Sequence, residues 1–266
     1  MKKWPIALQV YSVREQAQAD FPAAMKQLKQ MGYDGVELAG LYGYTAVQVR
    51  AMLDEAGLEL VCAHVPIEEL EKDAVLDDYA AAGMHLIAIP WLEAPKDEAE
   101  LAAVIQRIRS VAVRCKARGL QLLYHNHDFE FQKIADRYIL EAYYGEIDGD
   151  LLQTELDTCW VNMGGEEPSA YLRKYTGRAP VVHLKDFVGG KSAHMYGLIG
   201  TESEGGSGEF DYRPVGYGVQ DIPALLQAAE DAGCQWLIVE QDEPHQGKDR
   251  MECAEMSVKY LKTLIG

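Results

Sequence analysis

The sequence predicts an α/β fold, built as a single closed (β/α)8 barrel over residues 1–266. A helix-forming stretch, a glycine and a short run rich in Val, Ile and Leu recur along the chain. Counting these units gives eight candidate strands, the number found in such a barrel, and a chain of 266 residues is long enough for one barrel domain. The competing doubly wound open sheet is disfavoured because no GxGxxG motif follows the first strand.

The recurring unit accounts for the elements in chain order. The motif Asp20-Phe21-Pro22 predicts the start of a helix, with Asp20 as the N-cap and proline in the first turn. The apolar runs after the helices are typical of parallel strands covered on both faces. Five glycines stand where a helix would end in a left-handed residue: Gly32, Gly57, Gly83, Gly119 and Gly233. The candidate strands lie at 6–12, 35–39, 59–65, 85–90, 121–127, 152–158, 180–185 and 236–241.

The interval after the seventh candidate strand differs from the others. Residues 187–220 are rich in Gly and Ser and have no helical period. A loop of this length in a compact domain is typical of a functional segment. Because it leaves the C-terminal end of a strand, we expect it to cover the mouth of the barrel as a lid.

Composition restricts the classes of partner. The net charge is −17, from 25 basic and 42 acidic residues, which disfavours binding to nucleic acid or anionic membranes. The first residues have neither the pattern of a signal peptide nor that of a membrane span. The five cysteines include no CxxC pair, so we expect reduced thiols and a cytoplasmic location. The sequence does not decide whether the chain forms a homo-oligomer.

Polar side chains gather at the predicted C-terminal ends of the strands, where barrels carry their active sites. The stretch LLYHNHDFEF, at 122–131, is the densest example. Taken singly, a histidine or carboxylate at such a position is usually an ordinary hydrogen-bonded or solvated side chain. Ionisable residues stand at six of these strand ends, however, which meet only when the barrel closes, and charges buried together need partners or a metal ion. The residues are Gln9, Tyr11, Glu37, His64, Trp91, His125, His127, Asp157, His183, Lys185 and Glu240. Mixed imidazole and carboxylate ligands suit a divalent ion such as Mn²⁺, Co²⁺ or Zn²⁺.

Four motifs carry a resemblance to a known family. YHNHDFEF at 124–131, ELDT at 155–158, HLKD at 183–186 and IVEQD at 238–242 resemble, in order and spacing, the xylose isomerase-like TIM barrels. That superfamily includes sugar phosphate isomerases and epimerases, ketose 3-epimerases, inosose dehydratases and the apurinic endonuclease IV group. The resemblance extends over essentially the whole chain, starting at IALQVYSVR at 6–14.

The resemblance implies a set of metal ligands. Asp157, His183 and Glu240 match the family's positions, and His125 stands where the family usually has a glutamate. This departure leaves incomplete the two-base pair that ketose 3-epimerases use. Inosose dehydratase-like members also carry a histidine-rich fifth strand. Whether His125 or Glu130 is the fifth-strand ligand remains open, as does the direction in which Glu155 points.

The implied activity is that of a divalent-metal-dependent sugar isomerase or epimerase, acting through an enediolate on a keto-sugar or related polyol. Glu240 is the implied base, with Lys185 or His127 opposite it, although Lys185 could equally form an ion pair at the mouth. The alternative is a metal-dependent lyase or dehydratase acting on a keto-inositol or a 3-keto-glycoside. No glycine-rich cradle joins a basic cluster, which argues against a phosphorylated substrate. The residues expected to contact substrate are Gln9, Tyr11, Glu37, His64, Trp91 and Asn162.

Two rivals belong to other classes. An endonuclease IV-like enzyme would have a histidine three residues after Asp157, where this chain has Trp160, and the net charge of −17 also disfavours it. A non-catalytic sugar-binding barrel would keep the fold without turnover. Metal content would discriminate between that rival and an enzyme.

Overall fold

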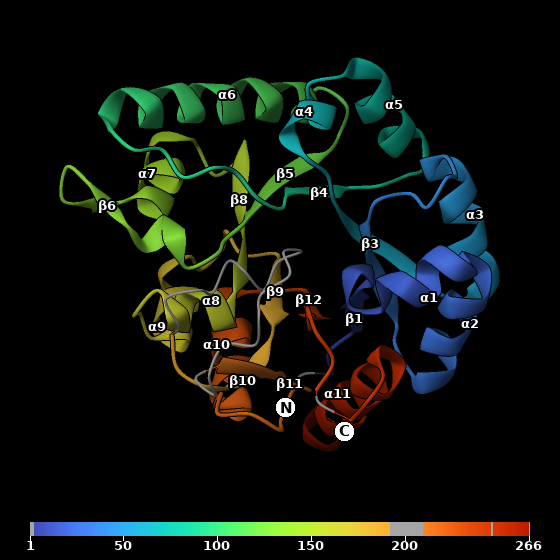
Figure 1. Cartoon of the computed structure of the whole chain (residues 1–266). Coiled ribbons are helices and arrows are strands. Elements are labelled where there is room, and N and C mark those ends of the chain that lie inside the picture. The colour runs from blue at the N-terminus through green and yellow to red at the C-terminus, as the bar shows by residue number, and fades with distance from the viewer. Residues whose placement is uncertain (1–2, 192–209, 246, 266) are drawn as a thin grey trace.

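A closed barrel of parallel strands forms the centre of the protein (Figure 1). The computed structural model describes residues 3–191, 210–245 and 247–265. The barrel has eight strands in the order β1-β12-β9-β8-β5-β4-β3-β2, which confirms the predicted (β/α)8 fold. Its strands are β1 (Ile6–Gln9), β2 (Gly35–Ala39), β3 (Glu59–His64), β4 (Leu86–Ile89), β5 (Gln121–His125), β8 (Leu152–Asp157), β9 (Val181–Leu184) and β12 (Trp236–Val239).

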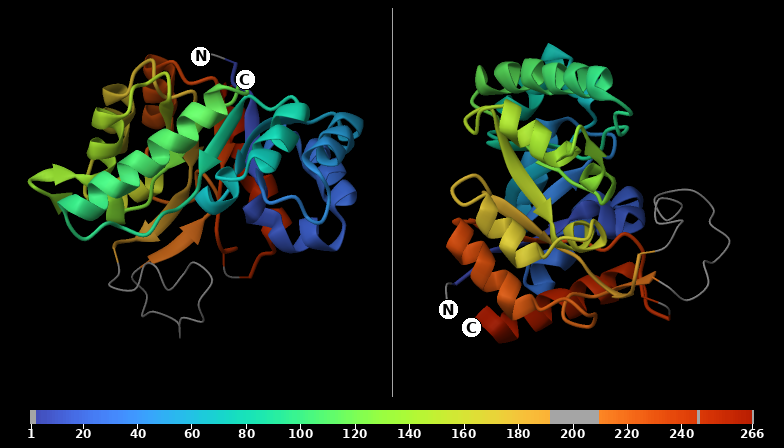
Figure 2. Two further views of the ribbon diagram at one scale, coloured as in Figure 1. Left: turned by 90° about the horizontal axis from the view of Figure 1, so that it is seen from above. Right: turned by 90° about the vertical axis from the view of Figure 1, so that its left-hand side faces the viewer.

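Helices surround the barrel and connect its strands (Figures 1 and 2). The longest is α6, and within the described ranges no helix is long and apolar enough to cross a membrane. The α-helices are α1 (Arg14–Ala19), α2 (Phe21–Met31), α3 (Ala46–Ala56), α4 (Ile67–Leu70), α5 (Asp73–Ala81), α6 (Glu98–Lys116), α7 (Ile139–Glu146), α8 (Thr158–Met163), α9 (Pro168–Lys174), α10 (Ile222–Ala232) and α11 (Arg250–Ile265). Two short 3₁₀ helices, η1 (Val10–Val13) and η2 (Phe129–Phe131), follow β1 and β5.

The local signals read from the sequence explain where these elements begin and end. The Asp20 carboxylate accepts a hydrogen bond from the Ala23 backbone N–H at 3.0 Å and so caps α2. All five glycines predicted to end helices have a positive φ, between 74° and 108°. The first strand is shorter than predicted because the Gln9 side chain accepts a hydrogen bond from the Tyr11 N–H, which starts η1.

The barrel interior has an apolar layer below a polar one. The apolar layer consists of Ala7, Val61, Cys62, Ala88, Leu123, Val181 and Ile238. Two residues further along the same strands, Leu123 is followed by His125, Val181 by His183 and Ile238 by Glu240. Side chains two apart on a strand face the same side, so this alternation puts the polar groups at the C-terminal mouth.

The interval after β9 corrects one expectation. Its two ends are not loop but an antiparallel ribbon of β10 (Asp186–Gly189) and β11 (Phe210–Arg213). The Asp186 carboxylate fixes the chain beyond β11, because it accepts backbone hydrogen bonds from Gly216, Gly218 and Gln220. Residues 192–209, the middle of the expected lid, lie outside the described residues. A second small hairpin pairs β6 (Lys133–Ile134) with β7 (Arg137–Tyr138).

Candidate active site

Four side chains from four adjacent strands meet at the C-terminal mouth of the barrel. His125 ends β5, Asp157 ends β8, His183 lies in β9 and Glu240 follows β12. Each offers one ligand atom, and these atoms all lie within 4.8 Å of one another. All four residues are buried. The cluster matches the set implied by the sequence resemblance, with His125 in the fifth-strand position. We call it the four-ligand set.

The donor chemistry of the four-ligand set fits a divalent ion. Two imidazoles and two carboxylates are a common set for transition metals. Asp157 Oδ2 is buried and accepts no hydrogen bond within the described part of the chain, although Lys185 Nζ lies 3.2 Å away. Asp157 Oδ1, by contrast, accepts the Trp160 N–H at 3.0 Å and caps α8. One oxygen of Asp157 therefore holds the backbone, while the other is left for an ion.

Two further carboxylates lie behind the histidines of the set. His183 Nε2 is 2.7 Å from Glu37 Oε2, and His125 Nδ1 is 3.3 Å from Glu155 Oε1. The opposite ring nitrogens face the set, with His183 Nδ1 2.9 Å from Glu240 Oε2. A carboxylate at the far nitrogen of a ligating histidine fixes its orientation and tautomer. Glu37 and Glu155 are placed for this role, so Glu155 points into the barrel.

A second group of possible ligands overlaps the first. His64, His125, Glu155 and His183 also have ligand atoms within 4.8 Å of one another. Here Glu155 Oε1 already lies 2.6 Å from His64 Nε2 and 3.3 Å from His183 Nε2. Glu155 is thus already paired with two imidazoles, whereas Asp157 Oδ2 of the four-ligand set accepts no hydrogen bond within the described part of the chain. Of the two groups, the four-ligand set is therefore the one with an oxygen left for an ion, and Glu155 is placed to orient the imidazoles.

Lys185 is the cation of the site. It is 1% exposed, and its Nζ lies 3.2 Å from Asp157 Oδ2, 3.2 Å from Glu240 Oε2 and 3.1 Å from Asp242 Oδ2. The ammonium also sits over the Trp160 ring, 5.0 Å from its centre. Burial alone would lower the pKa of Lys185, but the charges of Asp157, Asp242 and Glu240 raise it well above its usual value. Lys185 is therefore a fixed ammonium and not a free base.

Burial and neighbouring charges set the protonation of the ligands. Burial, with the nearby charge of His183 adding to it, lowers the pKa of His125 to about 3, which leaves this imidazole neutral. Burial raises the pKa of Asp157 to about 6. For His183, burial acts to lower the pKa, but the carboxylates of Glu37 and Glu155 raise it well above the usual value. A ligating histidine must be neutral, so binding of an ion would release a proton here.

Glu130, the other candidate for the fifth-strand ligand, is held away from the set. Its Oε1 accepts the Tyr124 hydroxyl at 2.7 Å, and its Oε2 accepts the His127 backbone N–H at 2.8 Å. Both bonds tie the turn after β5 to the strand. The carboxylate is fully buried, and burial raises its pKa to about 8.

We expect Glu130→Gln to change how the free energy of unfolding depends on pH. The folded-state pKa, about 8, lies above the ordinary value of 4.5, so the folded chain binds more protons between these limits. The stability that this group contributes is complete below pH 4.5 and is lost as the pH rises towards 8. Glutamine has the same shape as glutamate but does not ionise. The pH-dependent loss of stability, up to about 1.4 kcal/mol per pH unit, should therefore disappear in the variant.

Urea denaturation across this pH range measures the effect. Glu230→Gln, at an exposed position of α10, is the matched control and should leave the slope as it is in the unmodified protein. Identical slopes for the Glu130→Gln variant and the unmodified protein would show that Glu130 is ionised in the folded state.

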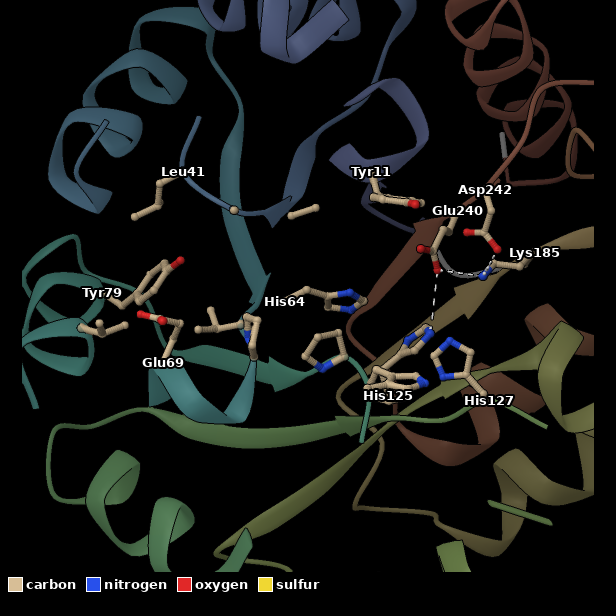
Figure 3. A pocket seen from close by; sticks show the side chains of 17 residues that line it. Tyr11, Leu41, His64, Glu69, Tyr79, His125, His127, Lys185, Glu240 and Asp242 are labelled. Carbon is tan, nitrogen blue, oxygen red and sulfur yellow. Dashed lines mark hydrogen bonds and ion pairs between the residues drawn. The ribbon is translucent and has the colours of Figure 1, made fainter. Parts of the chain in front are cut away.

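A cavity of 590 Å³ opens beside the four-ligand set (Figure 3). Figure 3 shows two sides to it: the histidines, Lys185, Glu240 and Asp242 face one part, and Leu41, Tyr79 and Glu69 lie around the other. It is lined by Tyr11, Ala39, Gly40, Leu41, His64, Val65, Pro66, Glu69, Val75, Tyr79, Pro90, Trp91, His125, His127, Lys185, Glu240 and Asp242.

The residues expected to contact substrate divide into three groups. Tyr11, His64 and Trp91 line the cavity, and Trp91 is 52% exposed at its rim. Gln9 and Glu37 lie beneath it and are tied together, because Gln9 Nε2 donates to Glu37 Oε2 at 2.8 Å. Asn162 is not brought to this cavity; it is exposed on α8 and lines a different cavity between α8 and α10. The helical turns after Asp157 rotate it away from the mouth.

Sequence reasoning missed two features of the site. Asp242 pairs with Lys185, and a signal for it existed: it stands two residues after Glu240, which favours the same side of the chain. The apolar part of the cavity was not expected, because it depends on how α4 and α5 pack over the ends of β3 and β4.

Comparisons with known proteins identify the family and support the fold. Residues 25–264 match the family model described as xylose isomerase-like TIM barrel. An inosose dehydratase of Clostridium beijerinckii is 22% identical over 276 residues, covering 92% of this chain and 90% of that protein. The chain also superposes on a sugar phosphate isomerase/epimerase from Parabacteroides distasonis with a TM-score of 0.82 and 21% identity, covering 98% of this chain and 94% of the other. A structure of L-ribulose 3-epimerase gives a TM-score of 0.71 at 15% identity, with 98% and 94% covered.

Proposed function

The chain belongs to the xylose isomerase-like TIM barrel family, and on that premise we propose that it is a divalent-metal-dependent enzyme that removes a proton next to the carbonyl of a neutral keto-sugar or keto-polyol, followed by elimination. The observation that carries this proposal is the four-ligand set at the wall of a cavity, beside a buried ammonium. His125, Asp157, His183 and Glu240 would hold the ion. When bound, such an ion would act as a Lewis acid on the carbonyl oxygen and acidify the neighbouring C–H.

The charges of the site support a divalent ion. Asp157, Glu240 and Asp242 carry three negative charges close to the single positive charge of Lys185. These carboxylates outnumber the ammonium, and a divalent cation that displaced the proton of His183 would offset the excess negative charge. Buried charges without such compensation are costly. Mn²⁺, Co²⁺ and Zn²⁺ all suit these ligands, and this donor set does not choose among them.

The remaining groups of the cavity suit elimination. His127 and Lys185 both line it, so an imidazole and an ammonium are available to the substrate. The imidazole of His127 would take the proton from the carbon, whose electrons then form the new double bond. The bond from the adjacent carbon to its oxygen breaks, and the ammonium of Lys185 would give that oxygen a proton as it leaves. The similarity to an inosose dehydratase supports the same reaction class.

Epimerisation by two carboxylate bases on opposite faces has less support, because the fifth strand presents His125 and Glu130 is tied to Tyr124. Isomerisation is the second candidate. It is favoured by one observation: Glu240 Oε2 and Lys185 Nζ are 3.2 Å apart, so a proton could be taken and returned on neighbouring carbons from one side. The net charge of −17 supports the proposed absence of nucleic-acid partners, and the five buried cysteines support the proposed cytoplasmic setting.

Solvent-deuterium exchange tests the proposal. Keto-sugars and keto-inositols are incubated in D₂O with the protein and followed by NMR, with and without a chelator. We expect metal-dependent loss of the C–H signal next to the carbonyl. An unsaturated product would identify elimination, and a rearranged ketose would identify isomerisation. No bound metal and no exchange on any substrate would favour the non-catalytic sugar-binding barrel.

A further inference from the structure

The cavity beside the four-ligand set continues into a part with apolar walls. Six residues form these walls, and we call this part the apolar annex: Leu41, Val65, Pro66, Val75, Tyr79 and Pro90. Val65 and Tyr79 are each only 3% exposed, so their side chains face the interior. In Figure 3, Leu41 and Tyr79 lie across the cavity from Lys185 and Glu240.

The annex is continuous with the site because residues of both line one cavity. Leu41 follows β2, which carries Glu37, and Val65 directly follows His64 at the end of β3. Val75 and Tyr79 lie on α5, which covers this side of the cavity. A molecule bound at the four-ligand set therefore meets the annex without crossing any other element.

The size and charge of the cavity limit what can occupy the annex. Cavities of roughly 300–1,000 Å³ hold ligands larger than a single sugar ring, and this one measures 590 Å³. Among its lining residues the only lysine or arginine is Lys185, which is already surrounded by three carboxylates. The charged residue next to the annex is Glu69, and its charge is already balanced by Lys72 at 2.6 Å. Within the described part of the chain, the annex therefore offers no free positive charge to a phosphate or carboxylate on the substrate.

We propose that the apolar annex receives an uncharged apolar group carried by the sugar ring, such as an aryl aglycone, so that the substrate is a keto-glycoside and not a sugar phosphate. This inference rests on the proposed function and narrows its substrate class. Burying an apolar group against these walls releases water from both surfaces. The free energy of burying a phenyl-sized group corresponds to a gain of about ten-fold or more in affinity.

Paired glycosides test the annex directly. The metal-loaded protein is titrated with methyl and phenyl β-D-glucopyranoside, and with the same pair in the galacto configuration, by ligand-observed NMR. We expect a phenyl glycoside to bind about ten-fold more tightly than its methyl partner. Glucose 6-phosphate should gain nothing over glucose. Val75→Phe fills the annex and should reduce the phenyl advantage to less than about two-fold while methyl binding and metal content stay unchanged.

Two further variants test whether the effect is specific to the apolar walls of the annex. Val47→Phe makes the same change at an exposed position of α3 and should leave the phenyl advantage intact. Leu41→Gln keeps the volume of the side chain but places an amide in the annex, and should also remove the advantage. Equal binding of phenyl and methyl glycosides, or no binding of either, overturns the inference.

The deuterium-exchange assay separates this outcome from failure of the proposed function. If free keto-sugars exchange and phenyl and methyl glycosides bind equally well, the inference about the annex is wrong and the proposed reaction is supported. A phenyl preference that Val75→Phe removes, without exchange on any substrate, would support the annex as a binding site and overturn the reaction.

Discussion

Replacing Asp157 with asparagine is expected to abolish divalent-metal binding and, with it, exchange of the proton next to the carbonyl. Asparagine retains an oxygen for the Trp160 N–H, now bonded at 3.0 Å, so the cap of α8 survives. Its other group is an NH₂ that cannot bind an ion, in place of Oδ2. Loss of a residue that hydrogen-bonds to a metal ligand weakens metal binding by about 10–100-fold. Loss of the ligand itself should therefore lower the affinity for the metal by more than about a hundred-fold. Elemental analysis after dialysis against a competing chelator measures this change.

The chain offers a matched control for that substitution. Asp221 caps α10 in the same way, accepting the Ala224 N–H at 3.0 Å, and lies outside the cavity. Asp221→Asn should therefore keep full metal content and exchange. A full equivalent of metal in the Asp157→Asn protein would place the ion elsewhere, with the group of His64, His125, Glu155 and His183 as the next position to examine.

The barrel could be predicted because its signals are local. Helix caps such as Asp20 and helix ends such as Gly32 act within a few residues, and both are found as predicted. The ribbon of β10 and β11 could not, because its two strands are separated by residues 190–209 and pair with each other outside the barrel. What fixes the segment after the ribbon is a bond pattern around Asp186 that joins residues 30 or more apart.

The convergence of polar strand ends could also be predicted, because barrel closure necessarily brings them together, whereas the choice of the four residues of the set came from the family resemblance. The direction of the Glu155 side chain could also have been predicted. Glu155 stands two residues before Asp157 on β8, and strand alternation puts both side chains in the interior. The position of Glu130 could not be predicted, because η2 turns the chain after β5 and sends this carboxylate back to Tyr124. A spacing of a few residues within a turn does not determine where a side chain points. A spacing of two residues within a strand does, because both side chains then face the same side.

Replacing Lys185 with methionine should destabilise the metal-free protein strongly. Methionine matches the length of the stem but leaves Asp157, Glu240 and Asp242 without their shared cation. Removing one partner of a buried charge pair costs about 3–5 kcal/mol, and we expect a loss of free energy of unfolding in that range, measured by urea denaturation with chelator present. The carboxylates can escape part of this cost by binding protons. Their pKa values then rise in the folded state, so the loss should grow as the pH increases.

A divalent ion should compensate for the missing ammonium, and this is what separates a charge effect from a packing effect. If the ion binds between the same carboxylates, adding it should stabilise the Lys185→Met protein more than the unmodified protein, which already has a cation 3.2 Å from Asp157 and from Glu240. A packing defect would give the same loss at every pH and no extra gain from metal. Lys174→Met, which removes an exposed lysine paired with Glu141, is the matched control and should change stability by less than about 0.5 kcal/mol. Equal metal stabilisation of the Lys185→Met and unmodified proteins would mean that the ammonium and the ion do not share these carboxylates, and the four-ligand set would then need a different occupant.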